Sequence, residues 1–477
     1  MKYHLEFDRD SDEKLYLQLY KIIKYEILNN KLKEGEKLPS IRQTAMRFKV
    51  NLNTVIQAYD ILENENYIMK IIGKGCFVLN KSNIISDEEN KPIVDNFYEG
   101  QIKIMDNINF AKGTLSPDYF PFELYKRFAN NIFDAGNPGI FEYQNVQGIS
   151  SLRKVVADAV EKNDIFTNSE EIIITSGTQQ SLNTILNFFH QNNKPNIVVA
   201  NASYPNALHL FKKNCNIYTI NQKNDGWDLE EFEILLKTVN ISFIYEVFNF
   251  QNPTGITWSD AKKQSIIELA HRYNFYIVED DSFADFYFGE TRPVPVKSFD
   301  KWDNEKVFYL KTFSKIIMPG IETAMLVCPK KYLKQLILIK HSLGTTTTGF
   351  NQKILENFLT SEEFSIHSER VRTILKEKQE YLLKRISKIK NVEVLFKPKG
   401  GFFIWIEVSP KINLENFINF CKESNLNMLN SSIFFPAQWE KNKFRLSFSS
   451  LTLEELEKGS LILKSILENS VNVDQKQ

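Results

Sequence analysis

The sequence predicts an α/β protein in which a small helical unit precedes a large domain built on a mostly parallel sheet. From Asn109 to about Asn469, short apolar runs alternate with amphipathic helical stretches, as at 171–175, 196–200, 242–248, 275–280 and 306–310. This alternation is typical of a parallel sheet whose two faces are covered by helices. A chain of 477 residues and 55.7 kDa also exceeds one ordinary core, so more than one domain is expected.

Composition indicates a soluble protein of a reducing compartment. Hydrophobic residues make up 43% and charged residues 25%, and the formal net charge is zero, so a nucleic-acid partner would have to be met by a local patch. The four cysteines are far apart, which predicts neither a disulfide framework nor a metal site. The first ten residues are polar and do not resemble a signal peptide, and no apolar run is long enough to span a bilayer. We therefore expect a cytoplasmic protein without a membrane partner.

The first 81 residues carry the pattern of a small DNA-binding unit. Apolar residues at helical spacing predict a first helix, a second is expected to start near Ser40, and a third follows residues 50–53. Two short strands around Gly73-Lys74-Gly75 would close the unit as a basic wing. This is the plan of a winged helix-turn-helix, which presents its third helix to the major groove of DNA. Residues 31–81 have nine Lys or Arg and five Asp or Glu, although this excess alone fits an ordinary solvated surface equally well.

The segment from Leu38 to Ile68, followed by the wing, closely resembles the GntR family of bacterial regulators. It has the Leu-Pro-Ser-x-Arg start, the Asn-Thr-Val turn, the Ala-Tyr-x-x-Leu helix and the Gly-x-Gly-x-Phe-Val wing of that family. The resemblance implies that the unit binds a double-stranded DNA operator through Ser40, Arg42, Asn51, Asn53, Thr54, Gln57 and Lys74. Many members have an arginine where this chain has Leu52, so one presumed contact is missing and the operator cannot be inferred by analogy.

Four segments of the large domain, each directly after an apolar run, carry side chains suited to cofactor chemistry. Gly177 and Thr178 open a helix whose N-terminal backbone N–H groups can bind phosphate, and Asn252 can donate to a phenolate oxygen. Asp280 lies where ligands bind in open α/β sheets and can pair with a protonated pyridine nitrogen. Lys315 is followed by an apolar turn, and a desolvated lysine becomes a nucleophile. Each segment alone also fits a plain turn or a solvated lysine.

Together these segments resemble the class I (fold-type I) aminotransferases over about 360 residues. The shared order is Ser-Gly-Thr-Gln, Asn-Pro-Thr-Gly, Glu-Asp-Asp, Ser-Lys-x-x-x-Pro-Gly, Gly-Gly-Phe-x-x-Trp and Arg-Leu-Ser-Phe. The resemblance implies a pyridoxal 5'-phosphate (PLP) site in which Lys315 is the Schiff-base lysine, Asp280 pairs with the pyridine nitrogen and Asn252 meets O3′. The other implied roles are phosphate binding by Gly177, Thr178 and Thr312, ring stacking by Tyr204, contact with the partner subunit's phosphate by Tyr143, and binding of an amino-acid carboxylate by Arg445. A GntR-type unit followed by such a domain looks like the MocR/GabR group of regulators.

Two positions depart from the aminotransferase pattern. Glu322 stands where the family usually has an arginine that grips the cofactor phosphate, and losing one charge-assisted bond costs roughly 1.5–3 kcal/mol. Ser282 replaces a tyrosine that helps to hold O3′, so Asn252 is left to make that contact alone. Three alternatives follow: weak PLP binding that senses cofactor supply, a rearranged phosphate site, or a degenerate scaffold. Asn206, where members that sense γ-aminobutyrate carry an arginine, argues against that effector.

The expected organisation is a winged helix-turn-helix over residues 1–81, a linker over 82–107 and an aminotransferase-like domain over 108–469 with a smaller C-terminal α+β subdomain. The expected function is a homodimeric transcriptional regulator that binds PLP through Lys315 and senses an amino compound or the cofactor itself. Two alternatives remain open: an active aminotransferase with a DNA-binding appendage, and a regulator whose large domain serves only for dimerisation.

Overall fold

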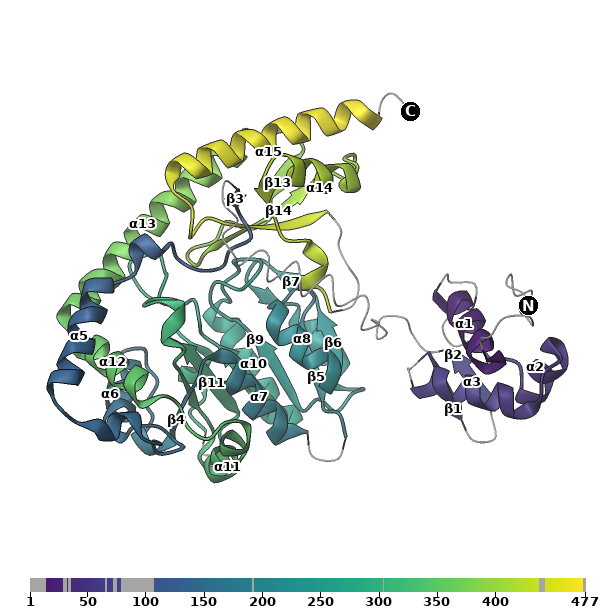
Figure 1. The fold of residues 1–477 in the computed structure, drawn as a ribbon, viewed down its shortest axis with the longest axis horizontal. Helices are drawn as coiled ribbons and strands as arrows, with labels where there is room; N and C mark the ends of the chain where they lie inside the picture. The colour runs from purple at the N-terminus through teal and green to yellow at the C-terminus, as the bar shows by residue number, and fades with distance from the viewer. Residues whose placement is uncertain are drawn as a thin grey trace. The chain divides into compact units, whose positions relative to one another are not determined.

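The computed structural model describes residues 14–28, 32, 36–64, 67–71, 75–78, 107–190, 193–302, 304–436 and 442–474 of the chain (Figure 1). It divides into two compact units, Met1–Pro92 and Ile93–Gln477. Each unit has its own hydrophobic core.

The first unit is a three-helix fold closed by a β-hairpin. Its elements are α1 (Leu15–Leu28), α2 (Ile41–Phe48), α3 (Leu52–Asn64), β1 (Ile68–Ile71) and β2 (Gly75–Val78). The apolar face predicted for the first helix packs against Val55, Tyr59 and Leu62 of α3, and all three of these side chains are fully buried. The two strands pair antiparallel, with Ile68 opposite Val78. Helix α3 begins earlier than expected, at Leu52, because the Asn51 side chain accepts the Thr54 backbone N–H at 2.7 Å and caps it.

The second unit is built on a seven-stranded sheet in the order β4-β12-β11-β10-β9-β5-β6. These strands are β4 (Ile172–Thr175), β5 (Asn196–Ala200), β6 (Asn216–Ile220), β9 (Phe243–Glu246), β10 (Tyr276–Asp280), β11 (Val307–Thr312) and β12 (Ala324–Val327). Only β12 runs antiparallel to its neighbours in this sheet. The predicted α/β class with a mostly parallel sheet is confirmed.

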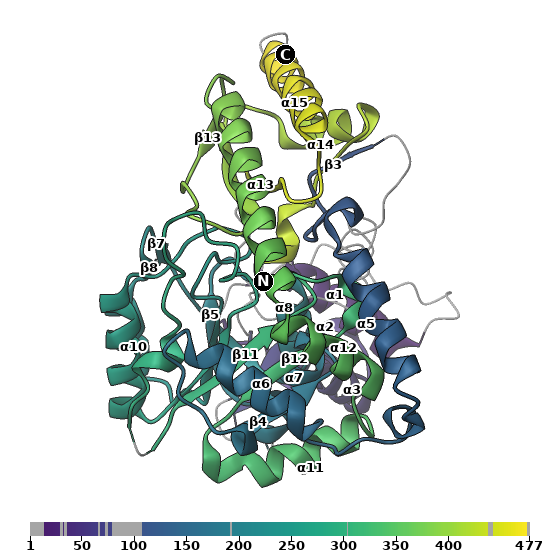
Figure 2. The same cartoon turned by 90° about the vertical axis from the view of Figure 1, so that its left-hand side faces the viewer.

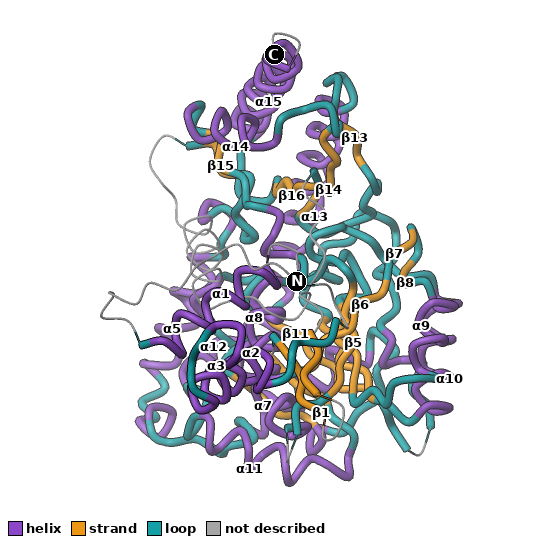
Figure 3. Tube along the Cα trace, turned by 90° about the vertical axis from the view of Figure 1, so that its right-hand side faces the viewer, coloured by secondary structure: helices purple, strands orange, loops and turns teal. Residues whose placement is uncertain are grey.

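Helices cover both faces of this sheet. The helices are α5 (Phe122–Asp134), α6 (Ser150–Glu161), α7 (Thr178–Phe189), α8 (Pro205–Asn214), α9 (Leu229–Leu236), α10 (Asp260–Tyr273), α11 (Leu333–Leu343) and α12 (Gly349–Thr360). Figure 3 shows α9 and α10 on one side of the strands and α5 and α12 on the other, and Figure 2 shows α10 opposite α5 and α12. Because both faces are covered, the strands are buried along nearly their whole length, and β10 and β11 are apolar except at their carboxyl ends, where Glu279, Asp280, Lys311 and Thr312 stand.

The smaller subdomain follows the long helix α13 (Glu362–Ile386). Strands β13 (Val392–Val394), β14 (Phe403–Val408) and β16 (Lys443–Ser447) form an antiparallel sheet, and α14 (Leu414–Glu423) and α15 (Leu453–Asp474) complete the subdomain. A short parallel pairing joins it to the start of the unit, where β3 (Ile108–Asn109) lies beside β15 (Leu426–Asn427). Within the described residues, no helix is both long enough and apolar enough to cross a membrane.

Candidate functional site

The chemistry-bearing side chains of the second unit meet at the carboxyl ends of the parallel strands. Asp280 ends β10, Asn252 follows β9, Thr178 begins the helix after β4, and Lys315 follows β11. One cavity is lined by Gly113, Thr178, Tyr204, Val247, Asn252, Asp280, Ser282, Phe283, Lys315, Phe403 and Arg445. The fold thus brings together six of the predicted site residues from segments that are up to 267 positions apart in the chain.

The Lys315 amine lies inside this cavity. Its Nζ donates to the backbone carbonyl of Gly113 at 2.9 Å. Burial and, to a smaller extent, the positive charge of Arg445 lower the pKa of Lys315 from 10.5 to about 8, and the negative charge of Asp280 opposes this shift. A substantial fraction of the amine is therefore neutral near pH 8, as a nucleophilic lysine requires.

Asp280 is a buried carboxylate held by two neighbours. Its Oδ2 accepts from the Tyr245 hydroxyl at 3.0 Å, and its Oδ1 accepts from both the backbone N–H of Ser282, at 3.1 Å, and the Ser282 hydroxyl. Burial raises the pKa of Asp280, and the hydrogen bonds from Ser282 and Tyr245 act against that rise. Ser282, which departs from the family pattern, therefore contributes a donor to Asp280.

A rigid turn presents Asn252. The side-chain amide nitrogen of Gln251 donates to the Ala202 carbonyl at 2.7 Å, and its side-chain oxygen accepts from the Thr254 backbone N–H at 3.0 Å. The turn ends at Gly255, whose φ of +75° favours glycine. The Asn252 Oδ1 accepts from Arg445 at 2.9 Å. The amide is thereby oriented with its oxygen toward the guanidinium, so its N–H groups are left to donate to a ligand.

Arg445 is a fully buried cation at the floor of the site. It donates to the Ala111 carbonyl and lies over the rings of Phe403 and Phe434, 4.3 and 5.1 Å from their centroids. Burial lowers the pKa of Arg445 to about 9. Its Nε is buried and has no hydrogen-bond partner among the described residues. An anionic ligand would satisfy this donor.

The remaining predicted cofactor residues, Gly177, Thr312 and Tyr143, do not line the cavity. Gly177 precedes α7 with a φ of +91°, and a Cβ built on it would meet nothing within 4 Å, so the start of this helix faces open space. Thr312 is buried at the end of β11. Tyr143 is 85% exposed. Glu322 is exposed, has a φ of +40°, and does not line the cavity.

Tyr204 lines the cavity from the residue preceding α8. Burial raises the pKa of its phenol to about 12, the nearby Asp280 charge adds to the rise, and hydrogen bonding with Asn206 and Gln179 opposes it. The ring is therefore a neutral phenol at physiological pH.

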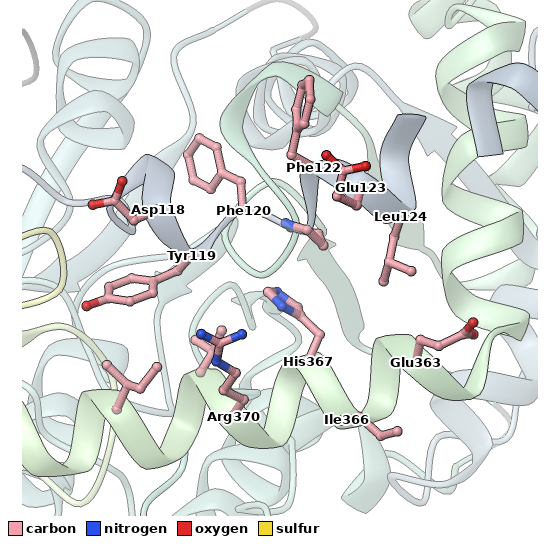
Figure 4. A pocket seen from close by; sticks show the side chains of 13 residues that line it. Asp118, Tyr119, Phe120, Phe122, Glu123, Leu124, Glu363, Ile366, His367 and Arg370 are labelled. Atoms are coloured by element: carbon pink, nitrogen blue, oxygen red, sulfur yellow. The ribbon is translucent and has the colours of Figure 1, made fainter. Parts of the chain in front are cut away.

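A second cavity of about 350 Å³ lies between the start of α5 and the start of α13 (Figure 4). Tyr119, Phe120 and Ile366 contribute apolar surface to its lining, and Arg370 contributes charge. His367 connects it with the first site, because its Nε2 donates at 3.2 Å to the carbonyl of Ile316, the residue after Lys315. No feature of the sequence predicted this cavity.

The predicted DNA-contacting residues surround the start of two helices in the first unit. Ser40 caps α2 in a capping box with Gln43, and Asn51 caps α3 by accepting from the Thr54 backbone and hydroxyl. Arg42 is exposed on α2. Asn53 and Gln57 are exposed on the first turns of α3. Lys74 lies outside the described residues.

Several residues that contact the site were not predicted from the sequence. Tyr245 could have been predicted, because it lies two positions after Phe243 in the buried strand β9. A tyrosine hydroxyl in a buried strand needs a hydrogen-bond partner, and here that partner is Asp280. Gly113 gave none, since its carbonyl meets Lys315 across 202 positions of the chain. Phe434 likewise reaches Arg445 from the short 3-10 helix Ser431–Phe434 in the small subdomain.

Comparison with known proteins identifies both parts of the chain. The profile of the family "Aminotransferase class I and II" matches residues 108–460, and that of "Bacterial regulatory proteins, gntR family" matches residues 15–78. The chain is 28% identical to the uncharacterized HTH-type transcriptional regulator YdfD of Bacillus subtilis, over 93% of this chain and 94% of that protein. It is 26% identical to the HTH-type transcriptional regulator NorG of Staphylococcus aureus, over 87% and 95% of the two chains.

The second unit is similar to an aminoadipate aminotransferase both in sequence and in a solved structure. The 2-aminoadipate transaminase of Thermus thermophilus is 30% identical over 74% of this chain and 88% of that protein. The crystal structure of LysN, an alpha-aminoadipate aminotransferase of the same species complexed with N-(5'-phosphopyridoxyl)-L-leucine, matches with a TM-score of 0.73 and 27% identity, over 80% of this chain and 95% of that one. The chain therefore belongs to the aminotransferase class I and II family and, with a GntR region ahead of that domain, to the MocR-type transcriptional regulators.

Proposed function

We propose that this regulator binds PLP at Lys315 and that its operator affinity responds to the cofactor or to an amino compound bound there. The observation that carries the proposal is that the amine of Lys315, whose pKa is lowered, the carboxylate of Asp280 and the guanidinium of Arg445 converge in one cavity. The domain boundaries that we propose are 1–81 for the DNA-binding unit, 82–107 for the linker and 108–469 for the ligand-binding domain.

The residues present fit this cofactor. Bound PLP would supply an aldehyde that an amine captures with loss of water, and a ring that withdraws electrons. Asp280 would hold a proton on the ring nitrogen, Asn252 would donate to O3′, and Tyr204 would cover the ring. Gly177, Thr178 and Thr312 would bind the phosphate at the open start of α7. The unpartnered Nε of Arg445 is placed to bind the carboxylate of an amino compound.

The segment 108–114 is suited to carry the response toward the linker. It begins directly after residue 107, where the proposed linker ends, and its Ala111 and Gly113 carbonyls accept from Arg445 and Lys315 respectively. A ligand that bonds to Lys315 or binds Arg445 competes with these two carbonyls. Ligand binding would therefore change the hydrogen bonds that Lys315 and Arg445 make to segment 108–114. The protein with ligand and the protein without it would then differ in their contacts to the residues that directly follow the linker.

Glu322→Arg is expected to strengthen PLP binding. Glu322 stands where the aminotransferase pattern has an arginine that binds the cofactor phosphate, and an arginine there would add a charge-assisted bond worth roughly 1.5–3 kcal/mol, or a rise in affinity of about 10- to 150-fold. Fluorescence titration with PLP measures this. Glu322→Gln is the matched control, since it removes only the negative charge. Equal affinities for the arginine variant and the wild type would show that position 322 does not face the phosphate.

We also propose a homodimer. Phe133 and Phe141 are 60% and 59% exposed, yet their rings stack at 5.8 Å, and both lie within 6 Å of the Phe350 ring. Such a solvent-facing aromatic cluster is typical of an interface, and Tyr143 lies close to it in sequence. Sedimentation velocity should give twice the mass of the 55.7-kDa chain, and Phe133→Glu with Phe141→Glu should give a monomer. A wild-type monomer at micromolar concentration would overturn the dimer.

The first unit should bind DNA through Arg42. Arg42→Ala is expected to weaken operator binding about 5- to 150-fold, because one contact to a base or a phosphate costs roughly 1–3 kcal/mol, and to lower the salt slope by about one if the contact is to phosphate. The exposed Arg272 on α10 provides the matched control. Unchanged affinity and salt dependence in Arg42→Ala would contradict this assignment.

Transamination is a second candidate function, because the groups it needs are present in the cavity and a relative at 30% identity carries a transaminase name. A coupled assay with common amino donors and oxo acids separates sustained turnover from a single half-reaction. A large domain that serves only for dimerisation would instead leave Lys315 without cofactor after borohydride treatment.

A further inference from the structure

We propose that helix α3 recognises thymine methyl groups through an apolar pair, Leu52 and Ile56. The inference rests on the DNA-binding function proposed above. Leu52 is 47% exposed and Ile56 38% exposed. The two residues are four positions apart in one helix, so their side chains are neighbours on one face.

The surroundings of this pair are suited to a polyanion. Asn53 and Gln57, which are also exposed, lie beside it, and Arg42 is exposed on α2. Helix α3 has no acidic residue before Asp60. Asp60 and Glu63 both lie beyond the first two turns and both pair with Lys70 of the hairpin, Glu63 at 2.8 Å, so the charge of Lys70 offsets one of these two negative charges. The first two turns of α3 therefore meet a phosphate backbone without repulsion.

The position of the pair on the helix indicates contact with bases. In helix-turn-helix proteins the N-terminal residues of the recognition helix meet the base edges, while the preceding helix crosses the backbone. Leu52 is the first residue of α3, and Ile56 follows one turn later. Asn51 is occupied in capping, so Leu52 is the first side chain of the helix that is free to reach the groove.

The aliphatic side chains of Leu52 and Ile56 favour thymine over the other bases. In the major groove, the thymine C5-methyl is the group that an aliphatic side chain matches, whereas guanine presents two acceptors. Two aliphatic side chains cannot donate to those acceptors, and covering them would leave them without hydrogen bonds. We therefore expect thymine at the positions beneath Leu52 and Ile56 in each half-site.

The test uses the full-length protein and duplexes selected by it from a random DNA library. Each thymine of the best duplex is replaced in turn by deoxyuridine, which removes only the methyl group. Wild-type protein should bind about fourfold more weakly for each contacted thymine, the effect of one buried methyl group. Leu52→Ala should lose this discrimination at one position and Ile56→Ala at another, while Leu461→Ala, an equally exposed leucine (54%) on α15, should keep both.

A variant with a changed base preference tests whether residue 52 contacts a base. Leu52→Arg should shift the selected duplexes toward guanine at the position beneath residue 52. Because Leu52 and Ile56 are exposed, the variants should keep the wild-type thermal unfolding midpoint.

The outcomes separate this inference from the DNA-binding function. If no duplex is selected by wild-type protein, the DNA-binding function itself fails. If a duplex is selected but no deoxyuridine substitution weakens binding, the thymine contact is wrong while DNA binding stands. If Leu52→Ala and Ile56→Ala leave DNA recognition unchanged and alter self-association instead, the pair is a protein contact and the inference is overturned.

Discussion

Lys315→Ala should abolish covalent capture of PLP and with it every ligand response of the protein. The wild-type amine is expected to produce a visible absorption band with added PLP and to become irreversibly labelled after borohydride reduction. Capture requires the neutral amine, and burial lowers the pKa of Lys315 to about 8. The rate of capture should therefore rise with pH through about pH 8, more than two units below the value of 10.5 for an ordinary lysine.

Lys212 provides the matched control. Burial also lowers its pKa to about 8, but its Nζ contacts the Phe435 carbonyl and it does not line the cavity. Lys212→Arg should keep the full absorption band. Equal labelling of wild type and Lys315→Ala would show that a lowered lysine pKa elsewhere in the chain explains the capture.

Arg445→Met should remove the recognition of a carboxylate while leaving cofactor capture in place. Removing one partner of a buried, hydrogen-bonded charged pair costs roughly 2–5 kcal/mol, so affinity for amino acids should fall on the order of 30-fold or more. Affinity for the corresponding decarboxylated amines should change little. The spectral change of the PLP-loaded protein on titration with each amino acid and its amine measures the ratio between them.

The same variant should also move the pH profile of cofactor capture. The positive charge of Arg445 contributes to the lowered pKa of Lys315, so its loss should raise that pKa and shift the midpoint of capture to higher pH. Arg445→Lys keeps the charge and should keep the midpoint. A midpoint that is unchanged in Arg445→Met, together with unchanged amino-acid affinity, would contradict the role assigned to Arg445.

The sequence predicted most of the elements because their signals are local. The five apolar runs named in advance correspond to β4, β5, β9, β10 and β11. Their alternation with helices implied the parallel sheet, because parallel neighbours need long crossover connections. The start of α2 was also predicted, since Ser40 and Gln43 form a capping box within four residues.

The candidate site was predictable only in part. Lys315, Asp280 and Asn252 each follow a strand, so their convergence at one sheet edge followed from the fold class. What these side chains contact did not follow, because Gly113, Tyr245 and Phe403 approach from segments that are distant in sequence. The consequence of Ser282 was missed although its contact is local: its hydroxyl donates to Asp280 two residues back, and the conformation of the turn decides this contact.

The effect of PLP on operator affinity tests the central claim most directly. Operator binding should be measured for the full-length wild type and for Lys315→Ala, without ligand, with PLP, and with PLP plus a panel of amino acids. At least one of these ligand states should change the affinity of the wild type about 5- to 150-fold and leave that of Lys315→Ala unchanged. Identical affinities of the wild type in all ligand states, or identical shifts in both proteins, would contradict a regulator that senses its signal at Lys315.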